Sequence, residues 1–202
     1  MPQELLIAEI IGIVAFALSG LFVATRQKLD LLGIFIISFL TALGGGVTRD
    51  IIIQKTPYSF SHFLPVGLVL GVVVIGLALR LHQKSTIESH FLFIISDTLG
   101  LVSFAITGAL LGIANDFHII GVLLLSLVTA VGGGVLRDML LNEVPLILKS
   151  DFYGSVALLV ATILYLLHLI EAVNTITIFA VFGCGIALRL IAHYKKWHLP
   201  KL

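Results

Sequence analysis

Cysteine and charged residues are scarce in this 202-residue sequence, and each shortage excludes a structural feature or a class of protein. A single cysteine, Cys184, cannot form an intrachain disulfide. Only 11% of the residues are charged, whereas soluble domains have about a quarter, so the composition excludes an ordinary soluble domain. The formal net charge of +1 gives no basis for expecting a nucleic-acid partner.

Motifs of enzymes and metal sites are also missing. The sequence has no G-x-S-x-G and no H-E-x-x-H, and its seven histidines never place two on one helical face at ligand spacing. An Arg-Asp pair alone supplies neither an activated nucleophile nor a metal site. We therefore expect no enzymatic activity, no resident cofactor and no structural metal.

Long apolar runs fill the sequence instead, and 59% of the residues are hydrophobic. A membrane-spanning helix needs about 20 mostly apolar residues. Seven runs approach this length, namely Leu5 to Thr25, Leu31 to Ile53, Leu64 to Leu81, Phe91 to Ala114, Ile119 to Leu141, Phe152 to Ile170 and Thr175 to Ala192. They predict an all-α membrane protein with seven transmembrane helices.

Basic residues gather on one side of this predicted bundle. Loops that stay in the cytoplasm are enriched in Lys and Arg. The connections after the first, third and fifth spans share a face with the C-terminus, and this face holds Arg26, Lys28, Arg80, Lys84, Lys149, Arg189, Lys195, Lys196 and Lys201. The opposite face holds only Lys55. We therefore expect a multi-pass protein of the inner (plasma) membrane with its N-terminus outside and its C-terminus in the cytoplasm.

Two copies of one unit make up most of the chain. GGGVTRD at Gly44 to Asp50 returns as GGGVLRD at Gly132 to Asp138, and the same offset of 88 residues (132 − 44) aligns a long stretch around both. Each copy contains three predicted spans, so the second copy enters the membrane from the opposite side. We expect a first three-helix repeat over residues 5–81, a second, inverted repeat over 91–170, a seventh helix over 175–192 and a basic cytoplasmic tail over 193–202.

Glycine triplets lie near the middle of the second and fifth predicted spans, as Gly44, Gly45 and Gly46 and as Gly132, Gly133 and Gly134. Each glycine costs about 1 kcal/mol relative to alanine inside a helix. One interpretation is that both helices are interrupted there, which frees backbone carbonyls to bind K⁺ or Na⁺ in a hydrated passage. The alternative is that the glycines only let the two helices cross closely.

Charged residues inside the spans form two equivalent sets, Glu9, Arg49 and Asp50 in the first copy and Asp97, Arg137 and Asp138 in the second. A charge at the bilayer centre costs about 2.5 to 3.5 kcal/mol, so these groups should face a cavity or a partner. Neighbours along one helix do not face each other, so each arginine needs a partner on another helix, or water. We predict Glu9 near Arg49 and Asp97 near Arg137, either as structural ion pairs or as gating charges.

Small and hydroxyl residues complete the pattern around the triplets. The hydroxyls of Ser19, Ser38, Thr41, Thr48, Thr107, Ser126 and Thr129 either line a polar path or bond their own backbone carbonyls. The GxxxG spacings of Gly67 with Gly71 and of Gly108 with Gly112 favour close helix packing inside the protomer.

The seven spans, the inverted repeat and the doubled GGGV[TL]RD motif resemble the prokaryotic branch of the trimeric intracellular cation (TRIC) channels. The resemblance covers about Leu5 to Ala192. It implies a homotrimer in which each protomer encloses its own pore for potassium and other monovalent cations, with spans two and five kinked at the glycines. Animal members carry a Lys-Glu-Val motif where this chain has Gly-Gly-Gly followed by Arg-Asp, so their regulation by an inositol lipid is not transferred.

The expected function is a passive, potassium-permeable cation channel with membrane lipid and further copies of itself as partners. In this hypothesis the triplets border the ion pathway, and the arginines gate it by swinging toward the acids. Some bacterial relatives in the same family have been described as glycine uptake systems. A secondary transporter for glycine or a similarly small solute is therefore the alternative.

Overall fold

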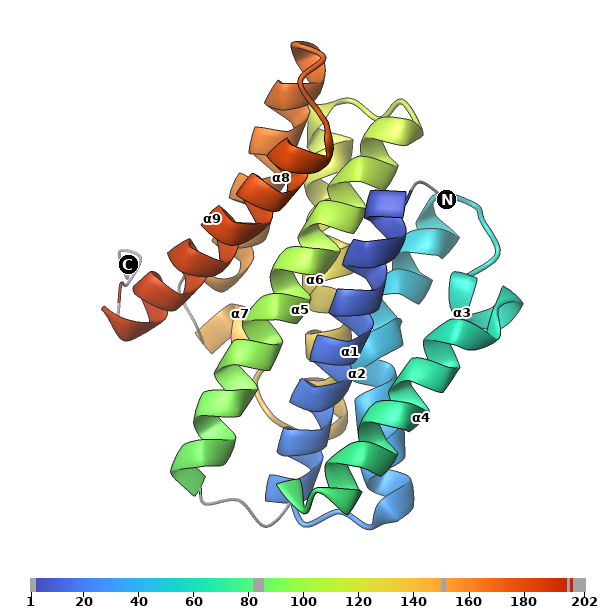
Figure 1. Ribbon diagram of the computed structural model, residues 1–202, viewed down its shortest axis with the longest axis vertical. Helices are drawn as coiled ribbons and strands as arrows, with labels where there is room; N and C mark the ends of the chain where they lie inside the picture. Colours follow the sequence, from blue (N-terminus) through green and yellow to red (C-terminus); the bar gives the residue numbers. More distant parts are fainter. Residues whose placement is uncertain (1–2, 82–85, 150–151, 196, 198–202) are drawn as a thin grey trace.

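The computed structural model describes residues 3–81, 86–149, 152–195 and 197, and the regular structure within these residues is helical. The helices are α1 Gln3–Arg26, α2 Leu31–Ile52, α3 Tyr58–Ser61, α4 Phe63–Ala78, α5 Thr86–Ala114, α6 Ile119–Leu140, α7 Leu146–Lys149, α8 Tyr153–Leu169 and α9 Thr175–Tyr194. They form one helical bundle (Figure 1). Lys84, Lys196 and Lys201 of the predicted basic face lie outside the described residues.

Length and hydropathy agree with the predicted all-α membrane fold. In the described chain, α1, α2, α5, α6 and α9 are long and apolar enough to cross a membrane. The shorter apolar helices α4, with 16 residues, and α8, with 17, correspond to the third and sixth predicted spans. At about 1.5 Å per residue they are shorter than the hydrocarbon core, and each is preceded by a single-turn helix, α3 or α7.

The sequence repeat is also a structural repeat, with α1 to α4 matching α5 to α8. Asp30 caps the start of α2 by accepting a hydrogen bond from the third amide of the helix, and its equivalent His118 does the same for α6. Gln54 and Asn142, again 88 residues apart (142 − 54), both have a φ near +55° just after these helices end. Helix α9 stands outside the repeat.

The centre of the bundle consists of α1, α2, α5 and α6, which contact one another. Phe16 of α1 packs on Gly100 of α5, and Phe104 packs on Gly12, so that each ring fills the space above a glycine of the other repeat. The two ring centroids lie 5.4 Å apart. Helix α4 covers α1 and α2, α8 covers α5 and α6, and α9 packs against α5 and α8 (Figure 1).

Both triplet-bearing helices are continuous, so the predicted interruption is wrong. Residues 31–52 and 119–140 are each one unbroken α-helix, in which the backbone carbonyls are not freed by unwinding. The alternative, close crossing, describes the structure. A Cβ on Gly45 would overlap the carbonyl oxygen of Thr129, and a Cβ on Gly133 would overlap that of Thr41. Tertiary packing therefore outweighs the low helix preference of the triplets.

The GxxxG prediction is right for one pair and wrong for the other. Gly108 and Gly112 lie against Ser126 and Val122 of α6, as expected for packing inside the protomer. By contrast, no described atom lies within 4 Å of the point where a Cβ on Gly67 or Gly71 would stand. These two glycines of α4 face away from the bundle, because α4 is an outer helix with only one packed side.

Candidate functional site

The first charge cluster consists of Glu9, Arg49, Asp50 and Thr107 and is buried between α1, α2 and α5. Nη1 and Nη2 of Arg49 donate to the two carboxylate oxygens of Glu9 at 2.8 and 3.2 Å. Nε of Arg49 donates to Asp50 at 2.8 Å. The arginine is only 2% exposed, and a charge buried this deeply requires such partners.

The second charge cluster consists of Asp97, Arg137, Asp138 and Ser19 and repeats this arrangement. Nη1 of Arg137 lies 3.1 Å from Oδ1 of Asp97, and Nε donates to Asp138 at 2.8 Å. The Arg137 side chain is fully buried. The predicted placements of Glu9 beside Arg49 and of Asp97 beside Arg137 are therefore confirmed, each as a direct ion pair.

Each arginine has the expected partner on another helix, but the premise that neighbours along one helix do not face each other is wrong for these residues. Arg49 and Asp50 are neighbours on one helix, yet they form an ion pair, as do Arg137 and Asp138. The rule that adjacent residues point apart applies to their Cβ atoms. The long arginine side chain turns back along its helix, so that Nε reaches the next carboxylate.

A hydroxyl from the opposite repeat completes each cluster. Thr107 of α5 accepts a hydrogen bond from Nη1 of Arg49 at 3.3 Å. The equivalent Ser19 of α1 accepts one from Nη1 of Arg137 at 2.8 Å and donates to Asp97 at 3.1 Å. Each arginine is therefore held by two acids of its own repeat and by a hydroxyl of the other, which ties the two halves together.

The two aspartates also anchor the loops that follow their helices. Oδ2 of Asp50 accepts a hydrogen bond from the backbone amide of Tyr58 at 2.9 Å, and Oδ2 of Asp138 accepts one from Leu146 at the same distance. Tyr58 and Leu146 are the first residues of α3 and α7. A movement of either cluster would therefore displace the start of the short helix that is bonded to it.

The other hydroxyls near the triplets make mostly local bonds. Thr41, Thr48 and Thr129 each donate to the carbonyl oxygen four residues earlier in their own helix. Ser126 instead donates across to the carbonyl of Ala105 at 2.8 Å. Within the described residues Ser38 Oγ has no hydrogen-bond partner. In this conformation these groups contribute to helix packing.

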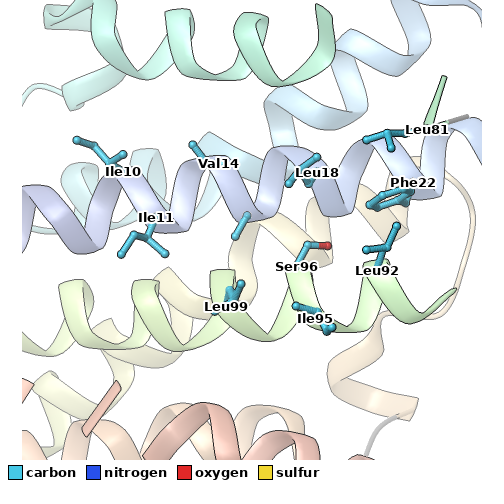
Figure 2. A pocket seen from close by; sticks show the side chains of 11 residues that line it. Ile10, Ile11, Val14, Leu18, Phe22, Leu81, Leu92, Ile95, Ser96 and Leu99 are labelled. Atoms are coloured by element: carbon cyan, nitrogen blue, oxygen red, sulfur yellow. The ribbon is translucent and has the colours of Figure 1, made fainter. Parts of the chain in front are cut away.

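Two hollows differ sharply in character. One of about 10 Å³, roughly the room for one water, is bordered by Glu9, Asp50, Gly46 and Pro65. The other, of about 510 Å³, lies between α1 and α5 and is apolar except for Ser96 (Figure 2). The small hollow adjoins the first charge cluster, whereas the large one offers an ion no charged group.

Sequence reasoning missed two contributors to the second charge cluster. Tyr153 of α8 is buried beside Asp97 and Arg137. Arg189 of α9 was expected at the basic face, but it is 7% exposed and its guanidinium lies 5.0 Å from the centre of the Tyr153 ring. For Tyr153 the sequence did contain a signal: it is a polar residue in the sixth predicted span, at the position where the first repeat has Pro65.

A family model described as glycine transporter matches residues 6–80 and 94–169, which are the two repeats. Curated relatives include the UPF0126 membrane protein YvgT of Bacillus subtilis, which is 32% identical over 99% of this chain and 96% of its own. The UPF0126 inner membrane protein YadS of Escherichia coli is 27% identical over 75% of this chain and 72% of its own.

Solved structures of similar fold are TRIC channels. A prokaryotic TRIC channel crystallised in 0.5 M KCl has a TM-score of 0.90 at 29% identity, covering 98% of this chain and 100% of that one. A TRIC cation channel studied for the basis of its conductance has a TM-score of 0.84 at 32% identity, with coverages of 100% and 98%. The TRIC trimeric intracellular cation channel orthologue of Rhodobacter sphaeroides has a TM-score of 0.88 at 27% identity, with coverages of 96% and 98%.

Proposed function

The chain belongs to the glycine-transporter family, in its prokaryotic TRIC branch, and from this premise we propose that it is a passive channel for monovalent cations such as K⁺. The observation that carries the proposal is the pair of buried charge clusters, one in each inverted repeat. Charged groups at this depth are costly, and they commonly mark the route of an ion. Here they occur twice at equivalent positions of a channel fold.

The proposed pathway runs within the protomer past the crossing of α2 and α6. Gly45 and Gly133 touch the opposite helix, so in this proposal the present conformation is the closed one. Conduction requires the two helices to separate at the triplets. The bare backbone of Gly44 to Gly46 and of Gly132 to Gly134 then borders the passage for K⁺ or Na⁺, because these residues have no side chains to fill it.

The two arginines are the proposed gates. A guanidinium in the pathway repels a cation, and each arginine is held by two carboxylates in the present conformation. A shift of Arg49 within Glu9 and Asp50, or of Arg137 within Asp97 and Asp138, changes the charge that a passing cation meets. Membrane potential and ion occupancy act directly on such groups.

Assembly and orientation follow from the same premise. We propose a homotrimer in the inner membrane with one pathway in each protomer, because the Rhodobacter sphaeroides relative is a trimeric channel and YadS is an inner membrane protein. The proposed topology has the N-terminus outside. The basic residues Arg26, Lys28 and Arg80 then lie at the cytoplasmic ends of their helices.

The alternative is a secondary transporter for glycine or a similar small solute. The description of the matching family model favours it, and inverted repeats are common in transporters. A transporter coupled to an ion accumulates its solute, whereas a channel only dissipates gradients.

Planar-bilayer recording of the purified protein under a potassium gradient tests the proposal. We expect discrete single-channel currents that reverse at the potassium equilibrium potential. Silent bilayers together with concentrative glycine uptake into proteoliposomes would refute the channel and support the transporter.

A further inference from the structure

The two copies of the glycine motif differ at one position, where GGGVTRD has Thr48 and GGGVLRD has Leu136. Thr48 is engaged within its own helix, because its hydroxyl donates to the carbonyl oxygen of Gly44 at 2.9 Å. The leucine side chain is longer and has no hydrogen-bonding group. It therefore makes a different contact in the second repeat, and this contact lies at the centre of the proposed pathway.

Leu136 reaches from α6 across to the glycine triplet of α2. It follows Gly133 by three residues, so it lies on the same face of α6, which is the face that meets α2. Its Cδ1 atom is 2.6 Å from the point where a Cβ on Gly44 would stand. The leucine thus occupies space that is available because Gly44 has no side chain.

The equivalent place on Gly132 is different. The atoms within 4 Å of the corresponding point are Cα and N of Gly45, at 3.1 and 3.7 Å, and in the described chain no side chain of another helix comes as close. Thr48 therefore does not do at Gly132 what Leu136 does at Gly44. Although the repeat is inverted and nearly symmetric, an apolar side chain covers one side of the crossing and not the other.

Leu136 has room to move. It is 38% exposed in the protomer, whereas the next residue, Arg137, is fully buried. Exposed side chains change rotamer far faster than whole helices move. The leucine can therefore turn away from Gly44 before the two backbones separate.

We propose that Leu136 is an apolar plug of the closed channel, which covers the crossing at Gly44 and turns away when an ion passes between α2 and α6. This inference rests on the proposed channel function and assigns the closed state a residue other than the arginines. An apolar constriction excludes water, so a hydrated cation does not cross it. The plug precedes Arg137 by one position, so the apolar constriction and the buried charge lie at nearly the same level of α6.

A double-mutant cycle tests this contact by single-channel recording. Leu136→Ala removes the atoms that cover Gly44, so the open probability rises severalfold. Gly44→Ala displaces the plug without changing it, because the new methyl group needs the place of Cδ1, while the next atom, Cα of Gly133, lies at an ordinary 3.5 Å. The open probability therefore rises here too. In the double variant the methyl group fills space that the leucine has left, so the open probability falls below that of either single variant.

This reversal separates a plug from a general loss of packing, since independent effects on open probability multiply. Met139→Ala is the control for the leucine, because it truncates an apolar side chain on the same helix that is 63% exposed. Gly67→Ala is the control for the glycine, because it adds a methyl group where no described atom lies within 4 Å. Both controls keep the wild-type open probability.

An unchanged open probability in Leu136→Ala, or a double variant in which the two single effects multiply, overturns the inference while wild-type currents uphold the channel. If a variant with Gly44→Ala does not fold, Leu136→Thr decides instead, since it gives the second repeat the residue of the first. A severalfold rise in its open probability supports the plug, and an unchanged value overturns it. A wild-type protein without currents refutes the proposed function itself.

Discussion

Gly45 of α2 and Gly133 of α6 face each other across the centre of the bundle, each against the backbone of the other helix. The contact is reciprocal because the repeat is inverted: Gly45 meets Thr129, and Gly133 meets the equivalent Thr41. No side chain larger than hydrogen fits at either position without moving a backbone. This close backbone contact between the repeats is therefore also the place where the proposed pathway must open.

Alanine at this crossing should destabilise the closed bundle. Gly45→Ala and Gly133→Ala each place a methyl group against a carbonyl oxygen, and overpacking of this kind costs about 1–3 kcal/mol. We expect a lower midpoint of thermal unfolding in detergent, followed by circular dichroism. Gly67→Ala is the control, because open space surrounds Gly67 and alanine favours the helix. Equal midpoints for all three variants would show that the crossing is not tight in the membrane protein.

The sequence predicted the acid-arginine pairs because the 88-residue offset relates two copies that must fold alike. Glu9 and Asp97 matched in depth and position, and each was found on its arginine. The offset could not predict Thr107 or Ser19 as partners of Arg49 and Arg137, since those contacts cross from one repeat to the other. Distances between repeats depend on how the copies pack, which the spacing within one copy does not contain.

The sequence could not decide whether α2 and α6 are continuous or interrupted, and the reason is energetic. A glycine triplet lowers helix preference whether the helix breaks or not, so the pattern suits both interpretations. What decides is the packing gained when two bare backbones meet, here Gly45 on Thr129 and Gly133 on Thr41. Similarly, Arg189 reads as a basic residue near a helix end, and only the packing of α9 places it over Tyr153.

Neutralising Arg49 should destabilise the protein more than neutralising Glu9. Arg49→Gln leaves two buried carboxylates without a countercharge, and breaking a buried pair in this way costs about 3–5 kcal/mol. Glu9→Gln leaves one arginine with Asp50, a balanced pair, and should cost about 1–3 kcal/mol. Unfolding free energies from denaturant titration in detergent compare the two. The double variant should recover part of the loss of Arg49→Gln, and a strictly additive loss would contradict the contact.

Removing the carboxylate of Asp50 should release the start of α3. Asp50→Ala takes away the acceptor for the Tyr58 amide, a hydrogen bond to a charged group, so this amide should exchange with solvent about tenfold faster or more. Hydrogen exchange followed by mass spectrometry measures this. Asp138→Ala should have the same effect at Leu146. Ser61→Ala is the control, because the described contacts of the Ser61 hydroxyl are with carbonyls of its own turn and with the ring of the neighbouring His62, and none is with Asp50.

Neutralising the buried arginines should alter conduction, which is the central requirement of the proposed gating. Arg137→Gln combined with Asp97→Asn removes a cation and an anion together, so the charge balance of the second charge cluster is kept while the guanidinium is lost. We expect a severalfold higher open probability in planar-bilayer recordings, because a cation no longer meets a positive group at that depth. Arg49→Gln with Glu9→Gln tests the first charge cluster in the same way, and a severalfold increase is again expected. Arg26→Gln, at the exposed end of α1, is the control. Unaltered single-channel currents in both paired variants would remove the arginines from the gate, and the clusters would then be structural ion pairs that hold the two repeats together.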